Sequence, residues 1–132
     1  MKLIDKIALL YLVDGKLLST RSKDKDKYYI PGGKREGDET DQETLIREIK
    51  EELNVDIREP SIRYYGTYEA QAHGHAEGIL VKMTCYFAEF DGEPEASSEI
   101  AELVWLTTAD VDRISPVDKL IFADLHKQGL LS

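Results

Sequence analysis

An acidic segment with helical periodicity limits how this chain folds more than any other feature of its sequence. Between residues 36 and 52 there are eight acidic side chains: Glu36, Asp38, Glu39, Asp41, Glu43, Glu48, Glu51 and Glu52. Thr40 and Glu43 have the spacing of a capping box, in which Thr40 caps a helix and Glu43 returns a hydrogen bond. Asn54 tolerates the left-handed conformation that often ends helices. The spacing therefore predicts a helix that begins after Thr40 and runs to about Leu53.

The expected helix carries an apolar face and an acidic face side by side. At about 100° per residue, one arc of about 100° is apolar and the adjoining arc is acidic. The apolar arc consists of Leu45, Ile46, Ile49 and Leu53, and the acidic arc consists of Glu48, Glu51 and Glu52. Because Glu52 lies only about 20° from Leu45, three carboxylates project together from the border of the buried face.

Two interpretations of these carboxylates remain open from the helical wheel alone. A charge run is usually a solvated face. Against this, like charges at i,i+4, such as Glu48 and Glu52, destabilise a helix by roughly 0.2–0.5 kcal/mol. A partly buried, unpaired carboxylate at Glu52 is also costly. Divalent cations would remove both penalties, since Mg²⁺ takes oxygen ligands.

Strand-like segments lie on both sides of this helix. Residues 6–13 are apolar and predict a strand, Asp14-Gly15 is a hairpin signal, and residues 16–20 predict the returning strand. Residues 28–30 predict a short strand that is stopped by Pro31-Gly32-Gly33. Further strands are expected at residues 62–69, 79–90 and 100–106, followed by a short helix over residues 107–114 and a longer one over residues 115–127. The order indicates an α/β chain in a single domain spanning residues 1–132.

Bulk composition excludes several classes of protein. No stretch approaches the ~20 apolar residues that a membrane helix needs, and the apolar run at residues 7–13 is interpreted as a strand. The lone Cys85 cannot form an internal disulfide, which fits a reducing, cytoplasmic setting. The net charge of -9 argues against a nucleic-acid coat protein. A small phosphorylated substrate remains compatible, because divalent cations can separate its charge from an acidic pocket.

The residues around the acidic helix form a longer pattern. Gly33 is followed by five residues, Glu39, seven residues, and then Arg47-Glu48-Ile49-Lys50-Glu51-Glu52-Leu53-Asn54-Val55. This resembles the Nudix box, G-x5-E-x7-R-E-U-x-E-E-x-G-U, where U is a bulky aliphatic residue. Asn54 stands where the family has Gly, and Asn is the next-best residue for a left-handed helix end. The lead-in Pro31-Gly32-Gly33 is also similar to the family.

The resemblance implies a fold, a metal and a reaction. The fold would be a Nudix-type α/β/α sandwich with a mixed β-sheet. The metal would be Mg²⁺, with Mn²⁺ as a substitute, and its ligands would be Glu48, Glu52, the carbonyl of Gly32, and Glu51 directly or through water. Water would attack phosphorus and displace a phosphate-bearing leaving group.

The resemblance also implies supporting roles within the box. Arg47 would orient the glutamates by ion pairing, and Glu39 would support the loop that Gly33 begins. The general base is either a box glutamate or a residue of a late loop, where Glu99 and Glu102 stand. The alternative for those two acids is a solvent-facing position beside the last strand.

Substrate contacts are expected from cationic and late-helix residues. Arg21 belongs to a basic stretch that ends at Lys27, and Lys34 follows Gly33 directly. A solvated loop is the default interpretation of the basic stretch, and phosphate capture is the alternative, so Arg21 and Lys34 are kept as candidate substrate-binding residues. His73 and His75 lie in a Gly- and Ala-rich loop and are too few for a metal site, so we expect a mobile loop beside the substrate.

Asp118 has two interpretations. In the first it stands at the third position of a helix capped by Ser115, with Pro116 in the first position. In the second it reads a purine, because members of the family similar to MutT carry an Asn or Asp shortly after a Pro in this region. We favour the capping interpretation and keep Asp118 as a candidate substrate-binding residue.

Together these features predict a MutT-like pyrophosphohydrolase that acts on a nucleoside di- or triphosphate or a related nucleotide. An ADP-sugar or dinucleoside polyphosphate hydrolase is the alternative enzyme, and a non-catalytic Nudix-fold nucleotide sensor is the alternative outside enzymes. Such sensors typically lose box glutamates, whereas this chain keeps Glu48, Glu51 and Glu52. We expect a small-molecule partner, no nucleic acid, no membrane, and a monomer or homodimer.

Overall fold

A mixed β-sheet runs through the centre of the structure, a computed structural model that describes residues 2–132. Its strand order is β4 (Gly32–Lys34), β1 (Lys2–Leu10), β7 (Ile79–Phe87) and β6 (Arg63–Gln71). β1 runs parallel to β7 and antiparallel to β4, and β6 is antiparallel to β7. The predicted mixed sheet is therefore confirmed, and its central parallel pair joins segments that lie far apart in the sequence.

Two smaller sheets complete the β-structure. One has the order β2 (Leu12–Val13), β3 (Lys16–Ser22) and β9 (Ile100–Leu106), and the other pairs β5 (Asp56–Ile57) with β8 (Phe90–Asp91). Asp14 and Gly15 join β2 to β3 with positive φ angles of 53° and 76°. Such angles at both central residues suit the tight turn of a hairpin, and this is why an Asp-Gly pair occurs there.

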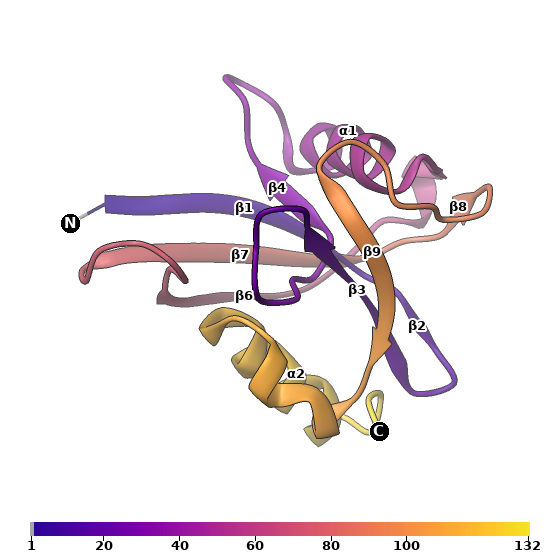
Figure 1. The fold of residues 1–132 in the computed structure, drawn as a ribbon. Helices are drawn as coiled ribbons and strands as arrows, with labels where there is room; N and C mark the ends of the chain where they lie inside the picture. The colour runs from indigo at the N-terminus through magenta and orange to yellow at the C-terminus, as the bar shows by residue number, and fades with distance from the viewer. Residues whose placement is uncertain (1) are drawn as a thin grey trace.

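Two α-helices cover opposite sides of the β-structure, as Figure 1 shows: α1 (Asp41–Leu53) and α2 (Pro116–Lys127). α1 begins with the predicted capping box between Thr40 and Glu43, and it ends at Asn54 in the left-handed conformation. Two 3-10 helices, η1 (Glu59–Ser61) and η2 (Thr108–Arg113), lie in the connections. The α/β/α arrangement agrees with the fold expected from the sequence. None of the helices in the described chain is long and apolar enough to span a membrane.

The alternation of side chains along β1 divides the core into two parts. Ile7 and Leu9 belong to a buried cluster that includes the apolar face of α1. Ala8 and Leu10 point to the other side of the sheet and belong to a cluster that includes the buried face of α2. Successive strand residues face opposite sides, so one strand supplies both layers.

Several predicted boundaries were wrong. The segment at residues 28–30 is not a strand: Tyr28 pairs only with Ile114 and Tyr29 only with Thr20, which are single bridges to two different elements. The strand lies instead at Gly32–Lys34, against β1. β1 begins at Lys2 rather than at residue 6, because it pairs with β7 along its whole length. The expected strand at residues 79–90 ends at Phe87, and Phe90 starts the separate strand β8.

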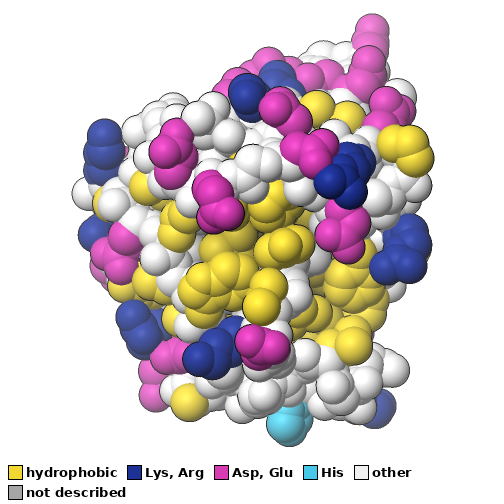
Figure 2. Space-filling view, turned by 90° about the vertical axis from the view of Figure 1, so that its right-hand side faces the viewer, with side chains coloured by type: hydrophobic (Ala, Val, Ile, Leu, Met, Phe, Trp, Pro, Cys, Tyr) yellow, Lys and Arg dark blue, Asp and Glu magenta, His cyan; other side chains and the backbone are white. Residues whose placement is uncertain are grey.

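Hydrophobic side chains also gather on one outer face. Figure 2 shows them at the centre of the side on which β2 and β8 lie, with acidic and basic side chains around them. Val13 of β2 and Trp105 of β9 are both 43% exposed. Tyr11 packs between aromatic neighbours, with ring centroids 4.4 Å from Phe90 and 6.2 Å from Trp105. Tyr11, Phe90 and Trp105 therefore form an aromatic group in addition to the two buried clusters.

Candidate active site

Two glycines of β4 allow the acidic face of α1 to approach the edge of the sheet. A Cβ atom at Gly33 would lie 2.3 Å from Cδ of Glu48. A Cβ atom at Gly32 would lie 2.0 Å from the carbonyl oxygen of Ile7, and φ at Gly32 is +146°. Gly32 therefore requires glycine, because backbone atoms and its positive φ leave no room for a side chain, whereas a side chain at Gly33 would displace the carboxylate of Glu48. The Pro31-Gly32-Gly33 segment therefore makes the space that Glu48 occupies.

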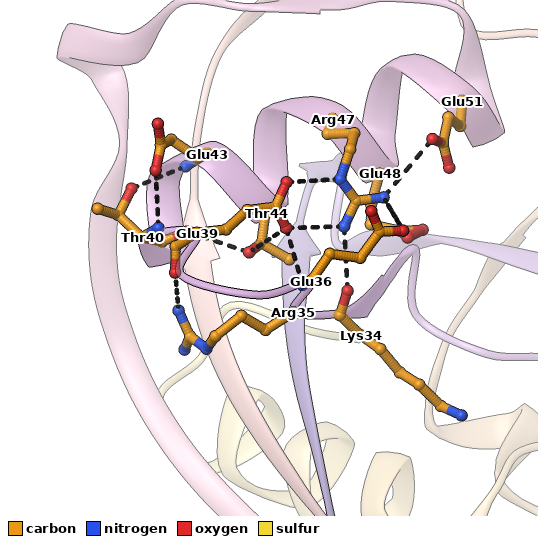
Figure 3. Close-up of polar contacts among 10 residues, drawn as sticks. All are labelled: Lys34, Arg35, Glu36, Glu39, Thr40, Glu43, Thr44, Arg47, Glu48 and Glu51. Carbon is orange, nitrogen blue, oxygen red and sulfur yellow. Dashed lines mark hydrogen bonds and ion pairs between the residues drawn. The ribbon is translucent and has the colours of Figure 1, made fainter.

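Arg47 ties α1 to the loop that precedes it, as Figure 3 shows. Its Nε and Nη2 donate to the two carboxylate oxygens of Glu39 at 2.7 and 2.9 Å. Its Nη1 donates to Glu48 at 3.1 Å and lies 3.5 Å from Glu51. Its Nη2 also donates to the carbonyl of Lys34 at 3.1 Å. One guanidinium thus fixes the carboxylate of Glu48, as the sequence pattern implied, together with the loop backbone.

The electrostatic effect of Arg47 is largest at Glu39. The hydrogen bonds from Arg47 lower the pKa of Glu39 to about 2, and a backbone hydrogen bond at Glu36 acts in the same direction. The side-chain hydroxyl of Thr44 also donates to Glu39, at 3.0 Å. Glu39 is therefore held as a carboxylate, and its interactions are with the loop and the helix.

Glu52 is the most buried carboxylate of the acidic face. It is 7% exposed, and its Oε1 accepts a hydrogen bond of 3.0 Å from the backbone N–H of Gly32. Burial raises the pKa of Glu52 to about 8, and the negative charges of Glu48 and Glu99 act in the same direction. Burial also raises the pKa of Glu48, although Arg47 opposes this effect. The protein by itself therefore disfavours placing full negative charge on both carboxylates.

The residues at this edge fit a divalent cation of the magnesium type. Within residues 2–132, no three His, Cys, Asp or Glu side chains are gathered as a ready-made metal-binding group. Mg²⁺ does not need such a group, because it usually binds through one or two carboxylates and keeps several waters. Glu48 and Glu52 line the same cavity beside Gly32. A cation between them would offset the charge that burial disfavours.

The cavity beside these glutamates has a volume of about 510 Å³. This lies within the range of ~300–1,000 Å³ that is typical of small-molecule sites. Its walls combine an acidic end, several cations and an apolar part. The acidic lining residues are Glu36, Glu48, Glu52 and Glu99; the cations are Lys6, Lys25, Lys34 and Arg35; and the apolar part includes Ile4, Ile30, Val81, Met83 and Val117. The cavity therefore offers separate surfaces to a charged group and to an apolar ring.

Several residues proposed from the sequence lie on this cavity, and others lie beside it. Gly32, Gly33, Lys34 and Glu99 line it together with Glu48 and Glu52. Glu51 has a side chain that is 53% exposed and an ion pair with Arg47. Glu39 and Arg47 support the loop and the helix from behind. The metal and catalytic roles assigned to these residues remain predictions.

Within residues 2–132, Arg21 is not among the residues that line the cavity, and its side chain is held in an ion pair. Its Nε and Nη2 donate to Oε2 of Glu102 at 3.1 and 2.9 Å. The other oxygen of Glu102 accepts a hydrogen bond of 2.9 Å from the hydroxyl of Tyr28. Phosphate capture by Arg21 would require this ion pair to open. Of the two late acids, Glu99 rather than Glu102 lines the cavity.

Asp118 does not cap α2, so the favoured interpretation of its side chain was wrong. The helix begins after Ser115 with Pro116 in its first turn, as predicted, but Ser115 makes no side-chain capping bond. Oδ2 of Asp118 instead accepts a hydrogen bond of 2.9 Å from the backbone N–H of Ile30. Its Oδ1 is buried and has no hydrogen-bond partner in the part of the chain that the structure describes. Burial raises the pKa of Asp118 to about 7.

Sequence reasoning missed one contributor to the cavity and a contact of another. Lys6 lines it from β1, and the signal was a lysine that shares a strand face with the apolar residues Ile4 and Ala8. His73 and His75 line it too, from the loop expected beside the substrate, but Nε2 of His73 also lies 3.1 Å from Oδ1 of Asp26. This contact joins two loops that are far apart in the sequence, so sequence spacing alone gave no indication of it.

Comparison with known proteins agrees with this fold. The NUDIX domain profile matches residues 4–125. Over 121 residues the chain is 27% identical to the uncharacterized Nudix hydrolase YvcI of Bacillus subtilis (strain 168), covering 89% of this chain and 77% of that protein. Over 110 residues it is 31% identical to the CTP pyrophosphohydrolase of Escherichia coli (strain K12), covering 80% of this chain and 76% of that protein.

Solved structures show the same arrangement of strands and helices. The solution structure of the E. coli ORF135 protein matches with a TM-score of 0.72 and 26% identity, covering 96% of this chain and 92% of that chain. The matched profile includes the glycines of β4, all of α1 and the strands on both sides. The chain therefore belongs to the Nudix family of hydrolases, as a pyrophosphohydrolase.

Proposed function

We propose that this chain is a Mg²⁺-dependent pyrophosphohydrolase that cleaves a diphosphate linkage in a nucleoside triphosphate or diphosphate, within a single domain spanning residues 1–132. The observation that carries the proposal is the pair Glu48 and Glu52, which line one end of the cavity beside Gly32. Their burial beside each other disfavours their own charge, and a divalent cation would reverse that effect.

Glu48, Glu52 and the carbonyl of Gly32 would hold the metal, with Glu51 joining directly or through water. When bound, Mg²⁺ neutralises the diphosphate, orients it and lowers the pKa of the attacking water. Mn²⁺ would substitute, because it accepts the same oxygen ligands. Arg47 would keep Glu48 in place through their hydrogen bond of 3.1 Å.

In the reaction, water oxygen attacks one phosphorus of the diphosphate and the bond from that phosphorus to the bridging oxygen breaks. The proton of the attacking water passes to a carboxylate, and the leaving phosphate departs with the bridging oxygen. Glu99 is our candidate for that carboxylate because it lines the cavity with Glu48 and Glu52. A box glutamate is the alternative, and the rate of a Glu99→Gln variant distinguishes the two.

The substrate class follows from the shape of the cavity and from one relative. The apolar part, which includes Ile4, Val81 and Met83, suits a planar base, and the acidic end suits a metal-bound diphosphate. One similar protein is named CTP pyrophosphohydrolase, and this supports a nucleoside triphosphate. Asp118 is a candidate for reading the base, since its buried Oδ1 accepts no hydrogen bond within residues 2–132, and Ile30, which donates to its Oδ2, lines the cavity.

The experiment is a hydrolysis screen with Mg²⁺ or with EDTA. The panel contains the ribo- and deoxyribonucleoside triphosphates and diphosphates, an ADP-sugar and a dinucleoside polyphosphate. We expect Mg²⁺-dependent release of phosphate or pyrophosphate from at least one nucleoside di- or triphosphate, and no release in EDTA. Turnover of only the ADP-sugar or the dinucleoside polyphosphate would overturn the substrate class, and nucleotide binding without any turnover would indicate a sensor.

A further inference from the structure

Lys6 lines the cavity from β1, which lies between β4 and β7 in the sheet. Its direct neighbours across the sheet are Lys34 of β4 and Met83 of β7, and all three line the cavity. Its Nζ lies 5.8 Å from the ring centroid of Tyr29, which forms part of the same wall. Because side chains alternate along a strand, Lys6 shares a face with Ile4 and not with the core residue Ile7. The ammonium group is therefore directed to the cavity side of the sheet.

The charge of Lys6 has no carboxylate partner at ion-pair distance among the described residues. No ion pair formed within residues 2–132 includes Lys6. Burial lowers the pKa of its ammonium, although Asp118 and Glu52 favour the charged form from a greater distance. A buried charge without a partner is costly. An anion that enters the cavity would remove that cost, whereas a neutral acceptor would remove only part of it.

The register of β1 gives the position of Lys6 relative to the two ends of the cavity. Ala8 is paired with Gly32, whose N–H binds Glu52 at the acidic end. Ile4 is paired with Val81, and both belong to the apolar part. Lys6 stands between Ala8 and Ile4, about 6–7 Å from each along the strand. It thus lies at the boundary between the metal-binding end and the apolar wall.

We propose that Lys6 binds the phosphate group that is attached directly to the nucleoside. This inference rests on the proposed function, in which the diphosphate occupies the acidic end and the base occupies the apolar part. The phosphate nearest the nucleoside then lies at the boundary, beside the Lys6 ammonium. A phosphate oxygen accepts a charge-assisted hydrogen bond from Nζ, and its negative charge supplies the missing partner.

The test compares nucleoside monophosphates with nucleosides in EDTA, so that no divalent cation contributes to binding. NMR titrations measure Kd for CMP and cytidine and for GMP and guanosine, with wild type and with Lys6→Met, Lys6→Gln and Lys6→Arg. Lys82→Met is the matched control, since Lys82 lies on β7 and is paired with Asp5, one residue before Lys6 and therefore on the opposite face.

We expect wild type to bind each monophosphate more tightly than its nucleoside. Lys6→Met and Lys6→Gln should reduce this affinity ratio by roughly tenfold, the size expected for a hydrogen bond to a charged group. Nucleoside affinity should not change, Lys6→Arg should keep most of the ratio, and Lys82→Met should behave as wild type. Both neutral variants should melt at or above the wild-type temperature, because an unpaired buried charge is removed.

Three results would overturn the inference: a wild type without preference for monophosphates, a ratio that Lys6→Met and Lys6→Gln leave unchanged, or an equal loss of nucleoside and monophosphate affinity. The last result would mean that Lys6 contacts the base. Failure of the proposed function is detected separately, as absence of turnover in the hydrolysis screen. If turnover is absent but the affinity ratio still depends on Lys6, the contact between Lys6 and the phosphate is still supported.

Discussion

Glu52 combines a cost to stability with the proposed function in a single side chain. It is 7% exposed, its hydrogen bond from Gly32 joins α1 to β4, and burial raises its pKa to about 8. The sequence predicted this border position, because the helical wheel places Glu52 beside Leu45. It did not predict the bond to Gly32, because that contact depends on how closely β4 approaches α1.

We predict that Glu52→Gln removes most turnover and leaves the fold intact. Glutamine keeps an oxygen for the Gly32 N–H but lacks the charge that a divalent cation needs. We expect kcat to fall by at least about 100-fold, since metal stabilisation of the reaction contributes several kcal/mol. The melting temperature should equal or exceed that of wild type. Glu93→Gln, on an exposed loop, is the control, and wild-type turnover by Glu52→Gln at saturating Mg²⁺ would refute the metal role.

Glu39 gives a prediction about acid stability. Its pKa is lowered in the folded protein to about 2 from the usual value of 4.5, mainly by the hydrogen bonds from Arg47. A lowered pKa stabilises the fold above the unfolded value and loses that contribution as pH falls toward the folded value. Wild type should therefore lose its stability advantage over Glu39→Gln between pH 4.5 and about 2. Urea unfolding of both proteins across this range measures it, and a constant difference would contradict the assignment.

At the scale of the element, α1 was predictable because its signals are local. The capping box, the apolar arc and the left-handed residue at its end all lie within the helix or next to it, and all three are present. The prediction of a strand at residues 28–30 was wrong for the opposite reason. Tyr28 and Tyr29 have β-forming side chains, but their partners Ile114 and Thr20 come from different elements. Local propensity cannot determine which distant segment a residue pairs with.

The end of α1 provides a test of that local reasoning. Asn54 has φ 55° and its Nδ2 donates to Glu95 at 2.7 Å, a contact that the sequence did not suggest. Asn54→Gly loses this exposed bond but relieves the left-handed backbone. We expect the free energy of unfolding to change by less than about 1 kcal/mol. Asn54→Ala should lose about 1–2 kcal/mol, because it keeps the unfavourable φ and loses the bond. Equal losses in the two variants would show that the bond to Glu95 dominates.

At the scale of the whole molecule, the cavity is made from segments that the sequence keeps apart. The Nudix box identified the acidic end, since its residues lie within one strand-loop-helix unit. The apolar wall and Lys6 depend on β1 lying between β4 and β7, a register that no local pattern encodes. Asp118 shows the same limit: its helix was predicted correctly, but its bond to Ile30 joins α2 to the segment before β4.

This long-range bond leads to a prediction for two variants of Asp118. Asp118→Ala leaves the buried N–H of Ile30 without a partner, which should cost about 1–3 kcal/mol of unfolding free energy. Asp118→Asn keeps an acceptor for that N–H, so its stability should stay closer to wild type. If Asp118 also reads the base, Asp118→Asn should change the ranking of kcat/KM across the four nucleobases. An unchanged ranking together with destabilised Asp118→Ala would make Asp118 purely structural.

The central claim is that Glu48 and Glu52 together bind the divalent cation, and Mn²⁺ binding followed by EPR tests it most directly. Protein is titrated into Mn²⁺ without nucleotide, and the signal of free Mn²⁺ reports binding. We predict that wild type reduces this signal, that Glu48→Gln combined with Glu52→Gln abolishes the reduction, and that Mg²⁺ competes in wild type. Equal binding of Mn²⁺ by wild type and the double variant, or no binding by wild type, would contradict the claim.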